Sequence, residues 1–380
     1  MNKYLRGVFG AILIFNEQKM TKIIAFYLPQ YHPIPENNEW WGEGFTEWTN
    51  VGKAKPLFSG HYQPRVPADL GYYDLRLPAS RIAQAALAKQ YGVDGFCYWH
   101  YWFGNGKRLL ETPFNEVLAA GQPDFPFCLG WANHSWEDKQ FNLEGTSKML
   151  IEQQYLGEAD YVLHFNTLLP AFKDERYIKV NDKPLFYIHS PLKIPDLAVF
   201  IKVWRTLALE NGFSGIHFVA NTHEVADIEK FKNMGFDAIN IVRMFHVFKK
   251  ENEFIRSAFN KIIKFITNRG QVIDYEIAAK YFSGKEDTYE HVYPSIFPNW
   301  DHSPRSARKG HILHQSTPQK FKKHVLKVLD SVKGKKEENK FIFLRSWNEW
   351  AEGNYMEPDL KFGRGYLEVL KEALDQVKHQ

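Results

Sequence analysis

Short apolar runs alternate with longer stretches of helical periodicity along the whole chain. Apolar runs of about four to eight residues between turn signals are typical of buried strands. Such runs predict strands at Ile23–Leu28, Gly95–Trp99, Phe125–Trp131, Pro184–His189, Ile216–Asn221, Ala238–Val242, Val292–Phe297 and Phe341–Trp347. The amphipathic stretches predict helices at Ala79–Tyr91, Ala159–Phe172, Asp196–Asn211, Val225–Met234, Glu253–Thr267, Gln319–Val332 and Tyr366–Val377.

This alternation predicts an α/β protein, a single-domain (β/α)8 TIM barrel. Strands that alternate with helices favour a parallel sheet, and eight repeats favour closure of that sheet into a barrel. We expect residues 1–20 to be an N-terminal extension and residues 21–380 to form the barrel domain. The long connections over residues 29–77 and 243–291 should form loops at the C-terminal face, where barrel enzymes carry their active sites.

Composition and charge narrow the class of protein further. The chain has 380 residues and a formal net charge of +4, which is too small to indicate a nucleic-acid partner. Cys97 and Cys128 lie within predicted strands, where cysteine behaves as a small apolar side chain. Two such cysteines do not indicate a secreted disulfide framework.

The N-terminus carries two alternatives. A basic start and an apolar stretch over residues 7–15 resemble a short signal peptide, but residues 16–19 offer no small-residue cleavage site. No apolar run reaches the length needed to span a membrane. We expect a cytoplasmic protein without a transmembrane segment, or a periplasmic one if residues 1–19 act as a signal.

The run Trp347-Asn348-Glu349-Trp350-Ala351-Glu352-Gly353 is the most informative motif. It follows the last predicted strand, so two carboxylates three positions apart, with indoles beside them, lie at the carboxyl end of that strand. Chemistry on sugars uses paired carboxylates, and aromatic rings suit sugar faces. The alternative is a structural turn whose glutamates cap a helix and whose tryptophans fill the core. Burying two glutamates without a partner or a purpose is costly, which favours catalytic roles for Glu349 and Glu352.

The other predicted strands also end in polar or aromatic residues. Candidate substrate-binding residues are Tyr31, His32, Trp48, Trp99, His100, Trp131, Asn133, His134, Asn221, Trp300, Asp301, Arg305, Trp347 and Asn348. In the first long loop Glu43 and Glu47 could also bind hydroxyls, and the alternative is that this aromatic loop plugs the barrel mouth. Core packing explains most rings next to His100. Asp301 with Arg305 fits an ion pair that fixes a loop as well as a hydroxyl-binding pair.

Several chemistries have no matching motif. No HExxH or closely spaced ligand set indicates a metal, and neither a GxxxxGK[ST] phosphate loop nor a GxGxxG turn is present. A DxD sequence and a GxSxG elbow are also absent. The sequence therefore predicts a site without metal or cofactor.

Five segments carry a family resemblance: Phe26–Trp48, Gly95–Phe103, Gly130–Trp136, Pro298–Arg305 and Trp347–Pro358. They resemble the WbsX-like proteins of bacterial surface-polysaccharide clusters, often labelled glycosyltransferases, which are similar to the family-99 glycoside hydrolases, the endo-α-mannosidases. The resemblance covers the chain from about residue 22 to 370 and is weakest between 140 and 290. Its most specific element is the Asn-Glu-Trp-x-Glu-Gly signature.

The resemblance implies a retaining glycoside hydrolase-like enzyme that acts on an α-linked bacterial oligosaccharide or polysaccharide. In the implied route through a 1,2-anhydro sugar, Glu349 deprotonates the 2-hydroxyl and Glu352 acts as general acid and then base. We expect indole neighbours and the charge of Glu349 to raise the pKa of Glu352. The sequence departs from the hydrolases at Ala351, where they tend to carry a polar residue. A glycosyltransferase of O-antigen or capsule synthesis with a nucleotide-sugar donor, and a non-catalytic glycan-binding protein, remain alternatives.

Overall fold

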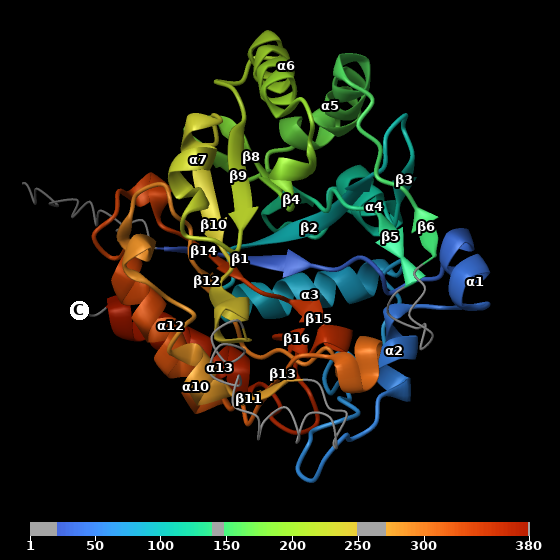
Figure 1. The fold of residues 1–380 in the computed structure, drawn as a ribbon, viewed down its shortest axis with the longest axis vertical. Helices are drawn as coiled ribbons and strands as arrows, with labels where there is room; N and C mark the ends of the chain where they lie inside the picture. The colour runs from blue at the N-terminus through green and yellow to red at the C-terminus, as the bar shows by residue number, and fades with distance from the viewer. Residues whose placement is uncertain (1–20, 139–147, 249–270, 379–380) are drawn as a thin grey trace, which may run out of the picture.

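Eight parallel strands form a nearly closed barrel with helices around it (Figure 1). The computed structural model describes residues 21–138, 148–248 and 271–378. The barrel strands are β1 (Lys22–Tyr27), β2 (Gly95–Trp102), β4 (Phe127–Trp131), β8 (Lys183–Ile188), β9 (His217–Thr222), β10 (Ala238–Ile241), β12 (Ser295–Ile296) and β14 (Phe341–Leu344). Each predicted strand is present, and the (β/α)8 prediction is confirmed.

The strands follow one another around the barrel in chain order. The hydrogen-bonded order is β10-β9-β8-β4-β2-β1-β14-β12, and every ladder between these neighbours is parallel. The last gap, between β10 and the segment leading into β12, is closed by a single parallel bridge between Ile239 and Val292. The Ile239 N–H donates to the carbonyl of His291 at 2.8 Å, and Tyr293 N–H donates to the Ile239 carbonyl at 2.9 Å. The barrel thus has one thin seam.

Helices cover the outside of the barrel between the strands (Figure 1). They are α3 (Pro78–Gln90), α4 (Thr112–Ala120), α5 (Glu158–Lys173), α6 (Leu197–Glu210), α7 (Asp227–Asn233), α12 (Pro318–Val332) and α13 (Gly365–Lys378). All but α4 were predicted, and the predicted helix Glu253–Thr267 lies outside the described residues. In α12 the Thr317 hydroxyl caps the first turn, and Phe321, Val325 and Val328 lie on the buried face.

Shorter elements decorate the connections. The long loop after β1 contains α1 (Pro35–Trp41) and α2 (Glu47–Lys53), which the sequence did not predict. Apart from 3-10 turns, the remaining short helices and strands are α10 (Tyr275–Ala279), α11 (Ser303–Ser306), β3 (Arg108–Leu109), β5 (Trp136–Glu137), β6 (Met149–Ile151), β7 (Lys179–Val180), β11 (Val272–Asp274), β13 (Ile312–His314), β15 (Asn348–Glu349) and β16 (Asn354–Tyr355). Within the described ranges, the helices are all too short or too polar to cross a membrane.

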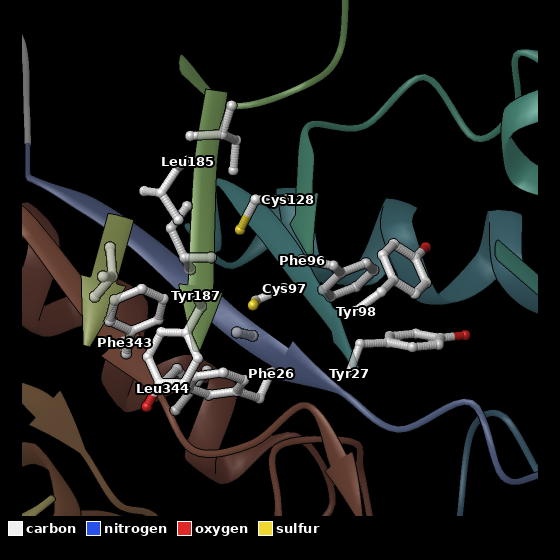
Figure 2. Close-up of a cluster of buried hydrophobic side chains, with 14 of the residues drawn as sticks. Phe26, Tyr27, Phe96, Cys97, Tyr98, Cys128, Leu185, Tyr187, Phe343 and Leu344 are labelled. Carbon is white, nitrogen blue, oxygen red and sulfur yellow. The ribbon is translucent and has the colours of Figure 1, made fainter. Parts of the chain in front are cut away.

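Aromatic rings fill the barrel interior. Figure 2 shows Phe26, Tyr187 and Phe343 gathered on one side of β1. The Phe26 ring lies 4.9 Å from that of Tyr187 and 5.2 Å from that of Phe343, each distance being between ring centroids. Burying one such side chain stabilises a fold by about 1.5–3 kcal/mol. Cys97 and Cys128 face each other in adjacent strands, and both are buried free thiols, as the sequence predicted.

Candidate active site

A cavity of about 600 Å³ opens where the barrel strands end. Every barrel strand contributes a residue near or just beyond its carboxyl end, and these are Leu28, Tyr101, Ala132, His189, His223, Val242, Trp300 and Arg345. The cavity volume falls within the range of ordinary small-molecule sites, about 300–1,000 Å³. Its position is the one at which (β/α)8 enzymes do their chemistry.

The two glutamates of the signature both line this cavity. Glu349 ends β15, and Trp350–Glu352 form one turn of 3-10 helix before the chain enters β16, which pairs with β15. Gly353 ends the turn with φ of +59°, and a Cβ there would lie 2.7 Å from the Asp301 Cβ. Only glycine therefore fits at the end of this turn.

Buried polar groups fix the turn from below. The Asn348 Oδ1 accepts the Leu28 N–H at 2.7 Å, and its Nδ2 donates to the Leu28 carbonyl at 3.0 Å. The Tyr31 hydroxyl donates to the Asn348 carbonyl and accepts the Trp350 N–H at 3.2 Å. Tyr31 and Asn348 were predicted to bind substrate; the structure places them beneath the cavity instead, where they position the glutamates.

Arg305 joins three carboxylates on the acidic side of the cavity. Its Nε donates to Glu47 Oε1 at 2.7 Å, its Nη1 donates to Glu352, and its Nη2 lies 3.4 Å from Glu349 Oε2. The Nε2 atom of His302 lies 3.7 Å from Glu352 Oε1. All three carboxylates and the guanidinium line one cavity.

This arrangement raises the pKa of both signature glutamates. Burial contributes most to the rise in the pKa of Glu349, the charge of Glu352 adds to it, and Arg305 opposes it; the result is a pKa of about 8. Burial and the charge of Glu47 raise the pKa of Glu352, again against Arg305. The sequence predicted a raised pKa for Glu352 but not for Glu349. Near neutral pH the pair can therefore hold one proton between them.

Aromatic rings and histidines also line the cavity. The Trp99 ring meets the His189 ring edge-on, with centroids 5.6 Å apart, and Trp300 meets Phe245 edge-on at 5.5 Å. Burial lowers the pKa of His134 to about 4 and that of His189 well below its usual value. These imidazoles are therefore neutral at physiological pH and can exchange hydrogen bonds with hydroxyl groups.

Asp301 lies behind the turn and supports it. Its Oδ2 accepts from His61 Nε2 at 2.8 Å and lies 3.5 Å from Arg65 Nη2. Arg65 also donates to the Gly353 carbonyl at 3.1 Å, and the Asp301 N–H donates to the Glu352 carbonyl at 2.6 Å. The suggested ion pair of Asp301 with Arg305 is wrong, because each has buried partners of its own.

Of the fourteen predicted substrate-binding residues, four line the cavity: Trp99, His134, Trp300 and Arg305. His100 and Trp131 face the helix layer, because side chains alternate along a strand and Trp99 already faces inward. His100 Nε2 lies 2.8 Å from His164 Nε2, and the Trp131 Nε1–H donates to the Trp102 carbonyl at 3.1 Å.

Three further residues that were predicted to bind substrate instead pack or hydrogen-bond outside the cavity. Trp347 is fully buried against Phe96. The Trp48 indole donates to the Tyr73 carbonyl at 2.8 Å, and His32 Nδ1 lies 3.0 Å from the Pro29 carbonyl, which fits the alternative of an aromatic plug.

Two asparagines that were predicted to bind substrate do not line the cavity and instead form hydrogen bonds with main-chain groups. Asn133 exchanges two hydrogen bonds with the Ser190 backbone. Asn221 donates to the His189 carbonyl and accepts from Arg345 at 3.0 Å. Both therefore support residues of the cavity lining from outside the cavity.

Other cavity residues were not among the predicted ones. They include Trp41, Phe45, Tyr101, Trp136, His189, His223 and Arg345, whereas Glu47, which also lines the cavity, was considered as a hydroxyl-binding residue. The sequence could have indicated Arg345 as a cavity residue, because a charged residue directly after four apolar strand residues must face a polar space. It donates to the Asn240 and Asn221 side chains at 3.1 and 3.0 Å. In the described parts of the chain, no group of three His, Cys, Asp or Glu side chains is arranged to hold a metal ion.

Comparisons with known proteins show the family and the fold of the chain. Residues 23–370 match the family model described as glycosyltransferase WbsX. Two curated relatives, each named uncharacterized protein WxcX, come from two strains of Xanthomonas campestris pv. campestris and are 34% identical over 368 residues. The match covers 93% of this chain and 50% of each relative, so the chain spans about half the length of the curated relatives it matches.

Solved structures of similar fold include a GH99 endo-alpha-mannosidase from Bacteroides thetaiotaomicron, with a TM-score of 0.53. It is 14% identical in its complex with BIS-TRIS-propane and 13% identical in a second structure, and each match covers 94% of this chain and 97% of that chain. A glycoside hydrolase-like protein reaches a TM-score of 0.57 at 13% identity, over 97% of both chains. At these identities the likeness shows the fold alone.

Proposed function

Because the chain belongs to the WbsX glycosyltransferase family, we propose that it is a carbohydrate-active enzyme that cleaves or transfers an α-linked sugar with retention. The observation that carries this proposal is the pair Glu349 and Glu352, bound to one guanidinium in a cavity that aromatic rings also line. Paired carboxylates are the usual means of glycoside chemistry. The alternative of a sugar-binding protein does not account for two buried carboxyl groups whose pKa values are both raised.

The proposed reaction uses one carboxylate and one carboxylic acid. Burial raises the pKa of Glu349 to about 8, so these roles require the proton that the pair shares to move from Glu349 to Glu352 when the substrate binds. Glu349 takes the proton of the 2-hydroxyl, O2 bonds to C1, and the bond from C1 to the leaving oxygen breaks. Glu352 gives its proton to that oxygen. Water or an acceptor hydroxyl then opens the 1,2-anhydro ring at C1 and loses its proton to Glu352, and Glu349 returns its proton to O2. Two inversions at C1 give net retention. The first step needs O2 trans to the leaving group, and α-mannosides meet this condition.

A glycosyltransferase with a nucleotide-sugar donor is the second candidate, because the family is described as one. The charges of the cavity favour a glycan donor instead. The guanidinium of Arg305 is held by three carboxylates, and Arg345 donates to asparagine side chains. A diphosphate needs available cations, a metal or helix N-terminal amides. The acidic lining would repel it.

The test is to incubate the purified protein with α-mannan oligosaccharides and an activated aryl α-mannoside, and separately with nucleotide sugars. Products and their anomeric configuration are followed by NMR. We expect Glu349→Gln to reduce turnover by about 100-fold or more on every substrate. Glu352→Gln should do so mainly on natural glycosides, whose poor leaving groups need the acid. The exposed Glu39→Gln serves as the matched control and should retain activity.

Three results would contradict the proposal. Near-wild-type activity of Glu349→Gln on both kinds of mannoside would eliminate the mechanism. Turnover of nucleotide sugars alone would favour the transferase. Binding of glycans without turnover of any substrate would favour the non-catalytic alternative.

A further inference from the structure

Glu47 is a third buried carboxylate at the site. It begins α2, where the Thr46 hydroxyl caps the helix and the Glu47 N–H donates to the Gln30 carbonyl at 2.9 Å. Its side chain is 2% exposed, yet it contributes to the cavity lining. These contacts fix the start of α2 and with it the Glu47 carboxylate. Glu47 is 302 positions from Glu349 in the sequence, yet both glutamates contact the Arg305 side chain.

The position of Glu47 determines how Arg305 is oriented. A guanidinium is a planar fork whose donors point in fixed directions. Glu47 Oε1 binds the Nε edge at 2.7 Å and also lies 3.3 Å from Asn50 Nδ2. With Nε held in this way, Nη1 and Nη2 are directed at Glu352 and Glu349.

Other titratable or charged groups near the cluster come from several elements. They are His302 before α11, Arg345 after β14, Tyr101 of β2 and Tyr31 after β1. Burial lowers the pKa of His302 to about 4, and burial raises the pKa of both tyrosines. These three groups are therefore neutral near pH 7. Arg345 is charged, but it donates hydrogen bonds to Tyr187, Asn221 and Asn240, which come from barrel strands.

We infer that Glu47 is a positioning residue of the reaction, which holds Arg305 across the signature pair and so fixes the number of protons that Glu349 and Glu352 share. This inference rests on the proposed function in taking these two glutamates as the reacting groups. Three carboxylates against one guanidinium leave an excess of negative charge in a buried space. One proton on the pair relieves that excess, and it is the proton that the leaving oxygen requires.

The inference predicts that two variants shift the higher pKa of the Glu349–Glu352 pair in opposite directions. Glu47→Gln keeps an oxygen for the Arg305 Nε but removes a negative charge, so the higher pKa of the pair should fall. Arg305→Gln removes the positive charge, so that pKa should rise, by about 1–3 units for a contact of this kind. A role in packing alone would not produce shifts of opposite sign.

The experiment is a pH titration of protein labelled with 13C at the glutamate side-chain carboxyl, followed by NMR. The resonances of Glu349 and Glu352 are assigned from their loss in the Glu→Gln variants. We expect a lower apparent pKa in Glu47→Gln, a higher one in Arg305→Gln and no shift in Glu39→Gln. Arg305→Lys keeps the positive charge and provides a folded variant if Arg305→Gln does not fold. The higher pKa of the Glu349–Glu352 pair should differ less from the wild-type value in Arg305→Lys than in Arg305→Gln.

An unchanged titration in Glu47→Gln, or shifts of the same sign in Glu47→Gln and Arg305→Gln, would overturn the inference. This result is distinct from a failure of the proposed function. The titration needs no substrate, whereas the function fails if Glu349→Gln remains active. Activity measurements on the mannosides then add a second readout, since the alkaline limb of turnover should move with the titration in each variant.

Discussion

Asp301→Asn should destabilise the protein by about 3–5 kcal/mol, the usual cost of breaking a buried ion pair. Asp301 is fully buried, and its Oδ2 accepts from His61 at 2.8 Å and from Gln63 at 2.7 Å. Arg65 lies 3.5 Å away and is itself buried. The amide can replace one hydrogen bond, but it leaves the guanidinium of Arg65 without its carboxylate.

The loss of stability caused by Asp301→Asn should become smaller as the pH falls. Burial would raise the pKa of Asp301, but the hydrogen bond from His61 and the charge of Arg65 outweigh it and hold that pKa well below the usual range. The stabilisation is therefore complete above the unfolded value, about 3.9, and is lost as the pH falls towards the folded value. Urea unfolding at pH 7 should show the full difference between the two proteins, and at about pH 3 the difference should be smaller.

Asp74→Asn is the matched control, because Asp74 also pairs with an arginine and also has a lowered pKa, yet its partner Arg76 is half exposed. An exposed pair contributes at most about 1 kcal/mol. If Asp301→Asn costs no more than Asp74→Asn, the view of Asp301 as the support of the glutamate turn is refuted.

Three further predictions concern other parts of the fold. Gly353→Ala should cost about 2–5 kcal/mol in urea unfolding, from the left-handed backbone and the 2.7 Å approach to Asp301; a cost under 1 kcal/mol would contradict the packing described. Burial lowers the pKa of His324 to about 3, so stability should fall by about 2 kcal/mol between pH 6.5 and 5 on its account, and His324→Phe should remove that part of the pH dependence. Glycan binding should change tryptophan fluorescence through Trp99, which lines the cavity; a signal that survives Trp99→Phe but is lost in Trp131→Phe would place the ligand elsewhere.

The barrel could be predicted from the sequence because its strands are short, apolar and regularly spaced. The same apolar character hid which aromatic side chains of a strand face the barrel interior and which face the helices. A strand that is buried on both faces shows no alternation of apolar and polar residues, so the run from Tyr98 to Phe103 did not reveal that Trp99 lines the cavity and His100 does not. The helix α4 was missed between two aromatic-rich segments, although Pro113 near its start and Gly121 after its end are regular signals.

The glutamate pair was predictable because its two members lie in one local motif. The partners of the pair were not, because they come from distant loops: Glu47 and Arg305 are 258 positions apart, and His61 and Asp301 are 240 apart. Nothing in a single sequence says which of several arginines meets which carboxylate. Only the folded chain brings α2 and α11 to the same side of the cavity.

The thin seam between β10 and β12 separates two walls of the cavity. His223 and Val242 follow the strands on one edge, whereas Trp300 and Arg305 follow the strand on the other edge. One backbone bridge therefore joins these two edges, while ladders join the other seven pairs of neighbouring strands. Amide hydrogens along this bridge should therefore be the first of the barrel to exchange with deuterium.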